Sequence, residues 1–500
     1  MISVDFSSFY KDIHGYEPFP WQRRLAERLL VQGWPEVLDL PTAAGKTSAI
    51  DVAVWALAMQ ADLPLDQRTA PRRIFFVIDR RIVVDEAYDH SLKIARALAN
   101  AQTPAVRAVA GALQRLGGGH DGALGEQLGE APPLAVARLR GGMYRNDTWA
   151  RCPDQPLVCV STVDQVGSRL LFRGYGLSPY QRPIHAGLVG NDALFLVDEA
   201  HLSGPFLETF QALQRFRQPG GGPALTPLRL VQMSATVDAA KDVHKINEED
   251  QAHPVLKKRL EASKVATLED TESLEQRAAE LALAFAEKVK VVGVVVNRVA
   301  AARKIQQLLT KELVKRGLEG RALLLTGRIR PADRDRLLKD WKAQISADRE
   351  GDPEKPLVLV ATQTVEVGAN LSFDALITEA APLDALRQRF GRLDRKGKNI
   401  RSEAYILCRK NQKEDPVYGS SLEDTWKWLN KVATQEKKGP KRVDFGISAL
   451  QPLLTDDIRS MLAPRAEAPV LLKSHMNAWL QTAPAPAVDP EVAPFLHGEG

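Results

Sequence analysis

The stretch Leu40-Pro41-Thr42-Ala43-Ala44-Gly45-Lys46-Thr47-Ser48 decides the fold class of this 500-residue chain. It follows a short apolar segment at 37–40 and precedes an apolar segment at 50–59, which has the length of a helix. Small residues let backbone N–H groups surround an anion, and the N-terminus of the next helix adds partial positive charge. The stretch therefore predicts a strand, a phosphate-binding loop and a helix, although Leu40 replaces the glycine that usually opens this pattern.

The polar side chains of this loop have the chemistry for a nucleoside triphosphate. Lys46 would reach the β and γ phosphates of ATP, and the Thr47 hydroxyl would hold Mg²⁺. We assign the rest of the nucleotide site to Thr42, Ala43, Ala44, Gly45 and Ser48. The alternative is a chance Gly-Lys-Thr at the start of an ordinary helix.

Two adjacent carboxylates, Asp198 and Glu199, follow the apolar segment 193–197. Such a pair is costly to hold together unless a cation neutralises it. This favours Asp198 as a second ligand of Mg²⁺ and Glu199 as the group that polarises the attacking water. A helix N-cap with an acidic first turn is the alternative interpretation. The phosphate loop lies upstream in the same alternation of strands and helices, and its presence favours the catalytic interpretation of Asp198 and Glu199.

Short β-branched segments alternate with helical stretches along most of the chain, and they are apolar on both faces, as buried parallel strands are. This alternation occurs twice, which predicts two parallel α/β domains in tandem. The predicted strands are 37–40, 74–78, 157–160, 193–197, 228–232, 291–296, 322–325, 356–360 and 375–378. Helices are predicted beyond them at 422–432, 447–462 and 469–480.

The same pattern predicts the domain boundaries. The predicted parts are an N-terminal segment (1–34), a first α/β domain (35–240) with a surface insertion at about 111–142, a charged linker (241–274), a second α/β domain (275–412) and a helical C-terminal region (413–500).

Positive charge is concentrated in residues 387–401, where seven Lys or Arg accompany one acid, Asp394. The whole chain has a net charge of only +5. Arg392 and Arg395 are three residues apart, which predicts that they share one helical face and reach one phosphate cluster. We expect both to act on the γ-phosphate as catalytic residues. An exposed basic helix is the alternative.

Composition excludes several other classes of protein. Apolar residues make up 44% of the chain, which is typical of a globular protein and not of a disordered or fibrous one. The apolar runs are too short to cross a bilayer, and the first nine residues lack a signal-peptide pattern, so we expect a cytoplasmic protein without a membrane partner. Three cysteines cannot supply a four-thiolate zinc site.

In this order, the motifs resemble those of superfamily 2 helicases with a DEAH box, whose fold is two tandem RecA-like domains. Phe19-Pro20-Trp21-Gln22 looks like the Q motif of that family, in which Gln22 would read adenine. Ser234-Ala235-Thr236 looks like motif III, and residues 361–368 look like motif V. The resemblance adds Gln22 and Gly368 to the nucleotide site.

Within that superfamily, the chain is most similar to the CRISPR-associated helicase of type I systems, and in particular to the type I-G (earlier I-U) branch. This similarity rests on the stretches 79–86, 161–176 and 198–206. ATP hydrolysis does not require these sequences, so the match is more specific than the superfamily motifs. The resemblance implies a path for single-stranded DNA lined by Arg80, Arg81, Thr162, Gln165, Thr326, Gly327 and Thr362. For Arg80 and Arg81 a solvated turn is the alternative.

The resemblance implies an ATP-dependent DNA helicase or translocase that unwinds target DNA in CRISPR interference, an antiviral defence. It would use ATP and Mg²⁺ and act with a surveillance complex that carries a guide RNA. Two alternatives stay open: an ATP-gated binding module that recruits a separate HD nuclease, and an RNA-directed DEAH-box helicase. His120-Asp121 is the only His-Asp pair, so we expect no HD nuclease activity in this chain, and we expect a C-terminal portion to be absent from it.

Overall fold

The structure is a computed structural model that describes residues 4–42, 44–79, 84–117, 132–141, 147–217, 226–233, 242–318, 321–327, 329–366, 370–398, 401–410, 415–435, 439–454 and 458–499. The chain forms two compact units. Unit 1 comprises Met1–His253 and Arg465–Gly500, and unit 2 comprises Pro254–Pro464. Each unit is described by itself below.

Among its described residues, unit 1 contains a sheet of seven strands in the order β3-β4-β2-β5-β6-β1-β7, and all neighbouring strands are parallel. The strands are β1 (Val37–Asp39), β2 (Arg73–Ile78), β3 (Ala135–Leu139), β4 (Leu157–Thr162), β5 (Ala193–Asp198), β6 (Leu228–Met233) and β7 (Val243–Lys245). Strands β2 and β4 are buried along their whole length, as their apolar sequences require.

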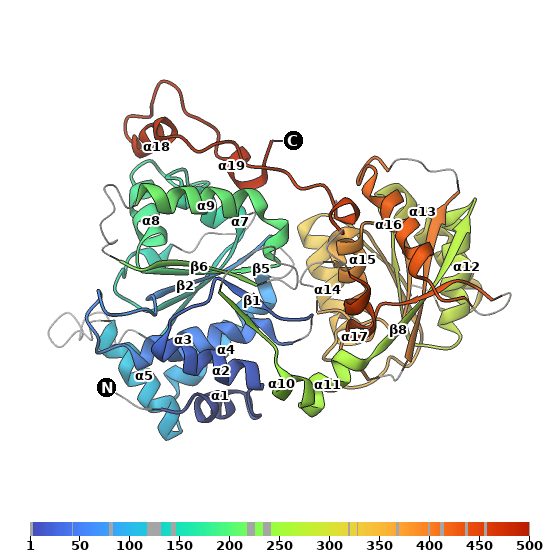
Figure 1. Cartoon of the computed structure of the whole chain (residues 1–500), viewed down its shortest axis with the longest axis horizontal. Helices are drawn as coiled ribbons and strands as arrows, with labels where there is room; N and C mark the ends of the chain where they lie inside the picture. The colour runs from blue at the N-terminus through green and yellow to red at the C-terminus, as the bar shows by residue number, and fades with distance from the viewer. Residues whose placement is uncertain are drawn as a thin grey trace. The chain divides into compact units, whose positions relative to one another are not determined.

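Helices cover both faces of this sheet, with α1 to α5 on one face and α7 to α9 on the other (Figure 1). The first group is α1 (Phe6–His14), α2 (Pro20–Val31), α3 (Ala49–Met59), α4 (Val84–Ala99) and α5 (Pro104–Leu116). The second is α7 (Val163–Leu170), α8 (Gln181–Gly190) and α9 (Gly204–Phe216). Helix α3 is buried on every side, because it is apolar except for Asp51.

Unit 2 has a second sheet, which in the described residues has seven strands in the order β10-β11-β9-β12-β13-β8-β14. These strands are β8 (Ser263–Thr271), β9 (Val291–Val295), β10 (Ala322–Leu325), β11 (Leu357–Ala361), β12 (Ala375–Glu379), β13 (Arg401–Arg409) and β14 (Arg442–Asp444). Only β14 pairs antiparallel. The helices are α11 (Pro254–Glu261), α12 (Leu274–Ala286), α13 (Val299–Lys315), α14 (Pro331–Ile345), α15 (Leu383–Phe390), α16 (Ser421–Val432) and α17 (Ile447–Leu450).

The fold class predicted from the sequence is confirmed, with every predicted strand present within a few residues of its expected bounds. Strands β3, β7, β8, β13 and β14 were not predicted. In β8 and β13, charged and polar residues interrupt the apolar pattern. The expected helix at 447–462 is wrong as a single helix, since α17 ends at Leu450, just before Pro452.

The compact units also divide the chain differently from the expected boundaries. The predicted linker 241–274 contains β7, α10 (Glu248–Ala252), α11 and β8, which join the two sheets without an unstructured connection. The predicted insertion contains the end of α5 and all of β3, an edge strand of unit 1, and its residues 118–131 and 142 lie outside the described part.

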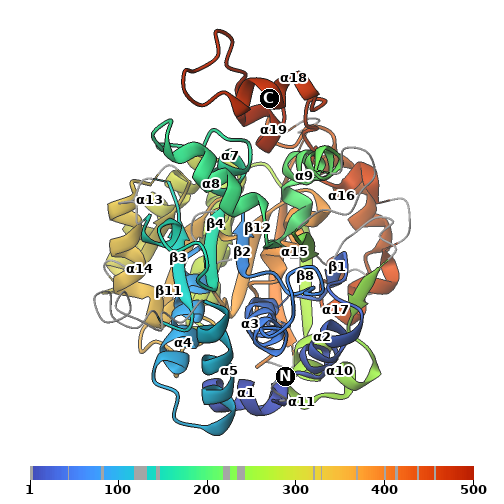
Figure 2. The same ribbon diagram turned by 90° about the vertical axis from the view of Figure 1, so that its left-hand side faces the viewer.

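The C-terminal residues pack on unit 1. Helices α18 (Lys473–Leu480) and α19 (Ala493–His497) follow unit 2 in sequence, but α19 lies against α7 and α9 (Figure 2). No helix in the described ranges is both long enough and apolar enough to cross a membrane.

Candidate active site

The phosphate loop lies between β1 and α3, as predicted. Gly45 has φ +79°, a conformation that favours glycine, and a Cβ atom there would lie 3.5 Å from the Phe19 ring. The Trp21 indole donates to the Ala44 carbonyl at 3.0 Å, which fixes the loop from α2. Lys46–Ser48 forms a short 3₁₀ turn that leads into α3. Ala43 lies outside the described residues.

Gln22 lies beside this loop, at the start of α2. Its Oε1 accepts from the Phe19 N–H at 2.8 Å, and its Nε2 lies 3.6 Å from the Cβ position of Gly45. Within the described part of the chain, this buried Nε2 has no hydrogen-bond partner. A buried amide without a partner is costly, so Gln22 offers a donor to a ligand at the loop.

The acidic pair stands at the carboxyl end of β5. The Lys46 Nζ lies 3.5 Å from Glu199 Oε1, and His201 Nδ1 lies 3.6 Å from Glu199 Oε2. Both side chains of the Lys46–Glu199 pair are 11% exposed, so each neutralises the other in a poorly solvated place. Glu199 has φ +48°, an uncommon conformation for this residue type, and such strain is typical of functional positions.

The structure therefore unites the two strongest motifs of the sequence, which lie about 150 residues apart. Strand β6 separates β1 from β5, and all three are parallel, so the phosphate loop and Asp198 follow the same edge of the sheet. The expected magnesium ligands are the Thr47 hydroxyl and the Asp198 carboxylate. These are hard oxygen donors, which fit Mg²⁺.

The arginine motif of unit 2 differs from its predicted form. Helix α15 ends at Phe390, and Arg392 and Arg395 lie in the turns beyond it, so the expectation of one helical face is wrong. Beyond the helix, Leu393 forms a parallel bridge with Phe373. Arg392 is 2% exposed and donates to the carbonyls of Val365 and Glu366 at 3.0 and 2.8 Å.

Arg389, which the sequence did not single out, is the centre of a buried network. Its guanidinium donates to Glu366 Oε1 at 2.9 Å, Thr378 Oγ1 at 2.8 Å and Asn297 Oδ1 at 2.9 Å. Burial lowers the pKa of Arg389, but the charge of Glu366 outweighs it and the pKa lies above its usual value. The basic run is thus partly neutralised inside unit 2.

Among the described residues expected to contact nucleic acid, Thr162, Thr326, Gly327 and Thr362 lie at strand ends or directly after them. In unit 2, β10 and β11 are paired neighbours, and Thr326 and Gly327 follow one while Thr362 follows the other. Both threonines are buried, and the Thr362 N–H donates to the Leu325 carbonyl at 3.2 Å. Gly368 lies outside the described residues.

In unit 1, Thr162 ends β4 beside the end of β2, and Gln165 lies in the first turn of α7. The Gln165 Oε1 accepts from Arg169 at 2.9 Å, so this amide has a partner inside the unit. Arg80, Arg81 and residues 234–236 lie outside the described ranges, as does His120.

The C-terminal segment 465–499 packs on the stretch 161–176, which the sequence marked as unrelated to ATP chemistry. Arg173 donates to Asp489 Oδ1 at 2.8 Å and to the carbonyls of Trp479 and Ala478 at 2.7 and 3.0 Å. Gly167 has no room for a Cβ atom because the Leu496 side chain fills that place. Contacts with a segment more than 300 residues away in sequence therefore explain why Arg173 and Gly167 occur in this stretch.

Replacing Arg173 with alanine should release the C-terminal segment from unit 1. Several charge-assisted or carbonyl hydrogen bonds would be lost together, at about 1.5–3 kcal/mol for a bond to a charged group. Limited proteolysis of the full chain should then cut within 465–499 about tenfold faster or more. Arg215→Ala, an exposed arginine on α9, is the matched control, and equal cleavage of the two variants would contradict the anchoring role.

Comparison with known proteins defines the class. The family described as CRISPR-associated nuclease/helicase Cas3, C-terminal, matches residues 288–398. The CRISPR-associated helicase Cas3 of Thermoproteus tenax is 37% identical over 114 residues, which are 23% of this chain and 17% of that protein. The crystal structure of T. fusca Cas3 with ADP has a TM-score of 0.59 at 17% identity, covering 91% of this chain and 54% of that one.

A second solved structure widens the comparison. The Mycobacterium smegmatis helicase Lhr, bound to single-stranded DNA and AMP-PNP, has a TM-score of 0.50 at 17% identity and covers 85% of this chain and 50% of its own. The chain thus shares its fold with these helicases. The chain is related to the CRISPR-associated Cas3 helicases, and it spans about half the length of the solved relatives named here.

Proposed function

We propose that the chain is an ATP-driven motor that moves along single-stranded DNA and unwinds target DNA in CRISPR interference. The observation that carries the proposal is the pair of Lys46 and Glu199, held 3.5 Å apart at the carboxyl edge of a parallel sheet. A lysine at a phosphate loop and a carboxylate at the end of a nearby strand are the minimum for positioning and attacking a γ-phosphate.

In this mechanism, Lys46 moves from Glu199 to the β and γ phosphates of ATP. Glu199, released from its cation, then orients and polarises the attacking water. Thr47 and Asp198 would hold Mg²⁺, which would supply positive charge to neutralise the phosphates. Gln22 would give its buried amide to the base. Arg392 and Arg395 are proposed to stabilise the charge of the transferring phosphate.

The nucleic-acid part of the proposal rests on the strand-end residues Thr162, Thr326, Gly327 and Thr362, together with Gln165, Arg80 and Arg81. Hydroxyls and backbone amides at strand ends contact phosphates without reading sequence, which suits a motor. A CRISPR surveillance complex with its guide RNA is the proposed partner, and a separate nuclease would cut the strand.

The first test measures ATP hydrolysis by the full chain alone, with single-stranded DNA and with RNA of the same sequence. We expect DNA to stimulate hydrolysis at least about tenfold more than RNA does, because the proposed substrate is DNA. Equal or greater stimulation by RNA would favour the RNA-directed alternative, since phosphate contacts alone distinguish the two poorly.

A strand-displacement assay then separates a motor from a binding module. A motor should release a labelled strand from a partial duplex only with ATP and Mg²⁺. ATP-dependent affinity for DNA without strand release would contradict the motor and support the ATP-gated module that recruits a separate nuclease.

A further inference from the structure

A buried cluster of two histidines and one carboxylate lies outside the nucleotide site, on the α1–α4 face of unit 1. Its carboxylate is Asp51, in α3, a helix in which every residue is buried. The Asp51 side chain is fully inaccessible. A carboxylate in such a place requires a cation or strong hydrogen-bond donors, because its desolvation is costly.

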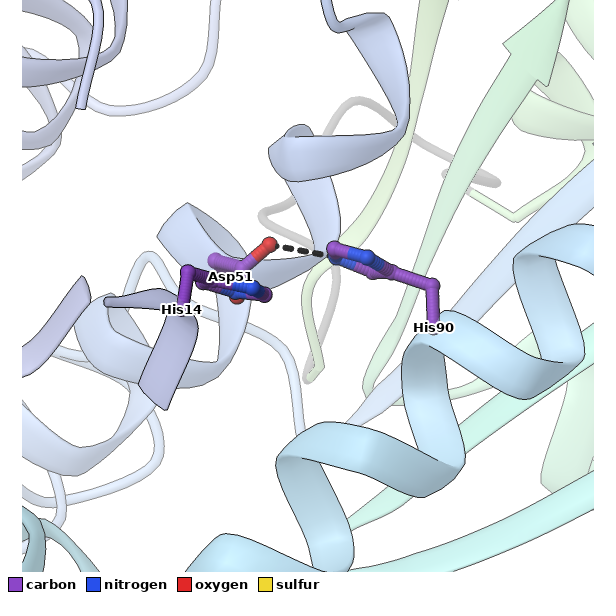
Figure 3. Close-up of side chains that lie close together, drawn as sticks. All are labelled: His14, Asp51 and His90. Carbon is purple, nitrogen blue, oxygen red and sulfur yellow. Dashed lines mark hydrogen bonds and ion pairs between the residues drawn. The ribbon is translucent and has the colours of Figure 1, made fainter. Parts of the chain in front are cut away.

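The two imidazoles reach this carboxylate from different helices. His14, the last residue of α1, places Nε2 2.8 Å from Asp51 Oδ1, and His90 of α4 places Nε2 2.6 Å from Oδ2. The rings are nearly parallel, with centroids 5.2 Å apart and planes inclined by 9°. Figure 3 shows the three side chains together, with His90 approaching Asp51 from α4.

Two imidazole nitrogens and one carboxylate form a ligand set that binds zinc and similar divalent metals. The three ligand atoms all lie within 4.8 Å of one another. Ligands about 2.0–2.1 Å from a tetrahedral ion are about 3.3 Å apart. Binding would therefore require His14 to withdraw from its carboxylate oxygen by about 0.5 Å and His90 by about 0.7 Å. The His90 side chain is 20% exposed, which permits that movement and admits a water as a fourth ligand.

The surroundings contain one feature that opposes a cation. Lys93 Nζ lies 3.3 Å from His14 Nδ1, although this lysine is exposed and can turn into solvent. The Tyr10 ring lies 4.4 Å from His14, and burial raises the pKa of Tyr10, so its phenol stays neutral.

The protonation of the cluster follows from the same contacts. Burial raises the pKa of Asp51, but the charge of His90 and the histidine hydrogen bonds outweigh it and hold the pKa at about 2. Burial lowers the pKa of His90, and the Asp51 charge more than reverses this, so the pKa is raised. A metal ion would take the place of the proton that otherwise balances Asp51.

We propose that His14, Asp51 and His90 bind one divalent transition-metal ion of the zinc class. The ion would tie α1 and α4 to α3, the helix that the phosphate loop opens. Tyr10 of α1 contacts Ser48 of that loop, with 3.2 Å between the two hydroxyls, so fixing α1 also supports the loop. The ion would have a structural role, separate from the magnesium of the nucleotide site.

The test uses the full chain, stripped with a chelator and titrated with Co²⁺ as a coloured substitute for zinc, without nucleotide or Mg²⁺. We expect one Co²⁺ per chain with the absorption of a tetrahedral or five-coordinate nitrogen and oxygen site, and without the sulfur charge-transfer band that Cys152 would give. We also expect Zn²⁺ to raise the melting temperature of the stripped protein, because binding to the native state stabilises it.

His90→Gln is the decisive variant, since its amide can still donate to Asp51 but binds transition metals poorly. Its Co²⁺ affinity should fall at least about 100-fold, and Zn²⁺ should no longer raise its melting temperature. Lys93→Gln is the matched control: it removes the opposing charge, so its Co²⁺ affinity should equal or exceed that of the parent chain. If the parent chain binds no more Co²⁺ than His90→Gln, the cluster is a hydrogen-bonded tie and the proposal is wrong.

Discussion

ATP turnover should fall at least about 100-fold when Lys46 is replaced by alanine. The side chain is the only lysine of the phosphate loop, and it already lies in a site where it is 11% exposed and 3.5 Å from Glu199. A charge in such a place acts on a bound phosphate with little screening by solvent. The loss should therefore appear mainly in kcat for hydrolysis, measured by phosphate release with single-stranded DNA present.

The variant also leaves Glu199 without its lysine, so folding must be checked separately. A thermal unfolding curve close to that of the parent chain would show that the loss is catalytic. Lys245→Ala, an exposed lysine on β7 of the same sheet, is the control and should leave turnover unchanged. DNA-stimulated hydrolysis retained in Lys46→Ala would contradict the assignment of the site.

The second large effect is expected for stability. Replacing Arg389 with methionine should destabilise unit 2 by about 3–5 kcal/mol, because it removes one partner of a buried ion pair. Glu366 would lose its cation, and the oxygens of Thr378 and Asn297 would lose their donor. Methionine fills a similar volume, so the effect reports the lost charge and hydrogen bonds more than a cavity.

The measurement is urea unfolding of the full chain, followed by hydrogen exchange of peptides from β9, β11 and β12. Arg387→Met, two residues earlier on the same helix and only partly buried, is the matched control. A difference of less than about 1 kcal/mol between the two variants would contradict the central role of the network.

Nine of the fourteen strands in the described residues, and the strand, loop and helix around Lys46, were predictable from the sequence, for a local reason. Parallel strands buried on both faces must be short apolar runs, and the loop that binds phosphate must be small and followed by a helix, so each signal is contained in a few consecutive residues. The pairing of Lys46 with Glu199 followed because the carboxyl ends of parallel strands share one edge of the sheet.

Because these sequence signals are local, they gave a wrong prediction and missed some strands. Arg392 and Arg395 were placed on a helix from their spacing alone, but α15 ends at Phe390, and spacing carries no information about where a helix ends. Strand β8 alternates apolar and polar residues beside charged ones, and only its neighbours β13 and β14 make it a strand.

The sequence by itself determined the fold class, the strand, loop and helix around Lys46, and the strand that precedes Asp198 and Glu199, because each depends on residues that are adjacent in the chain. Only the tertiary structure decided why the stretch 161–176 has Gly167 and Arg173, which contact a segment that returns from residues 465–499. It also decided that His14, Asp51 and His90 meet in one buried cluster. Long-range packing creates such contacts, and no pattern within a single stretch of sequence records them.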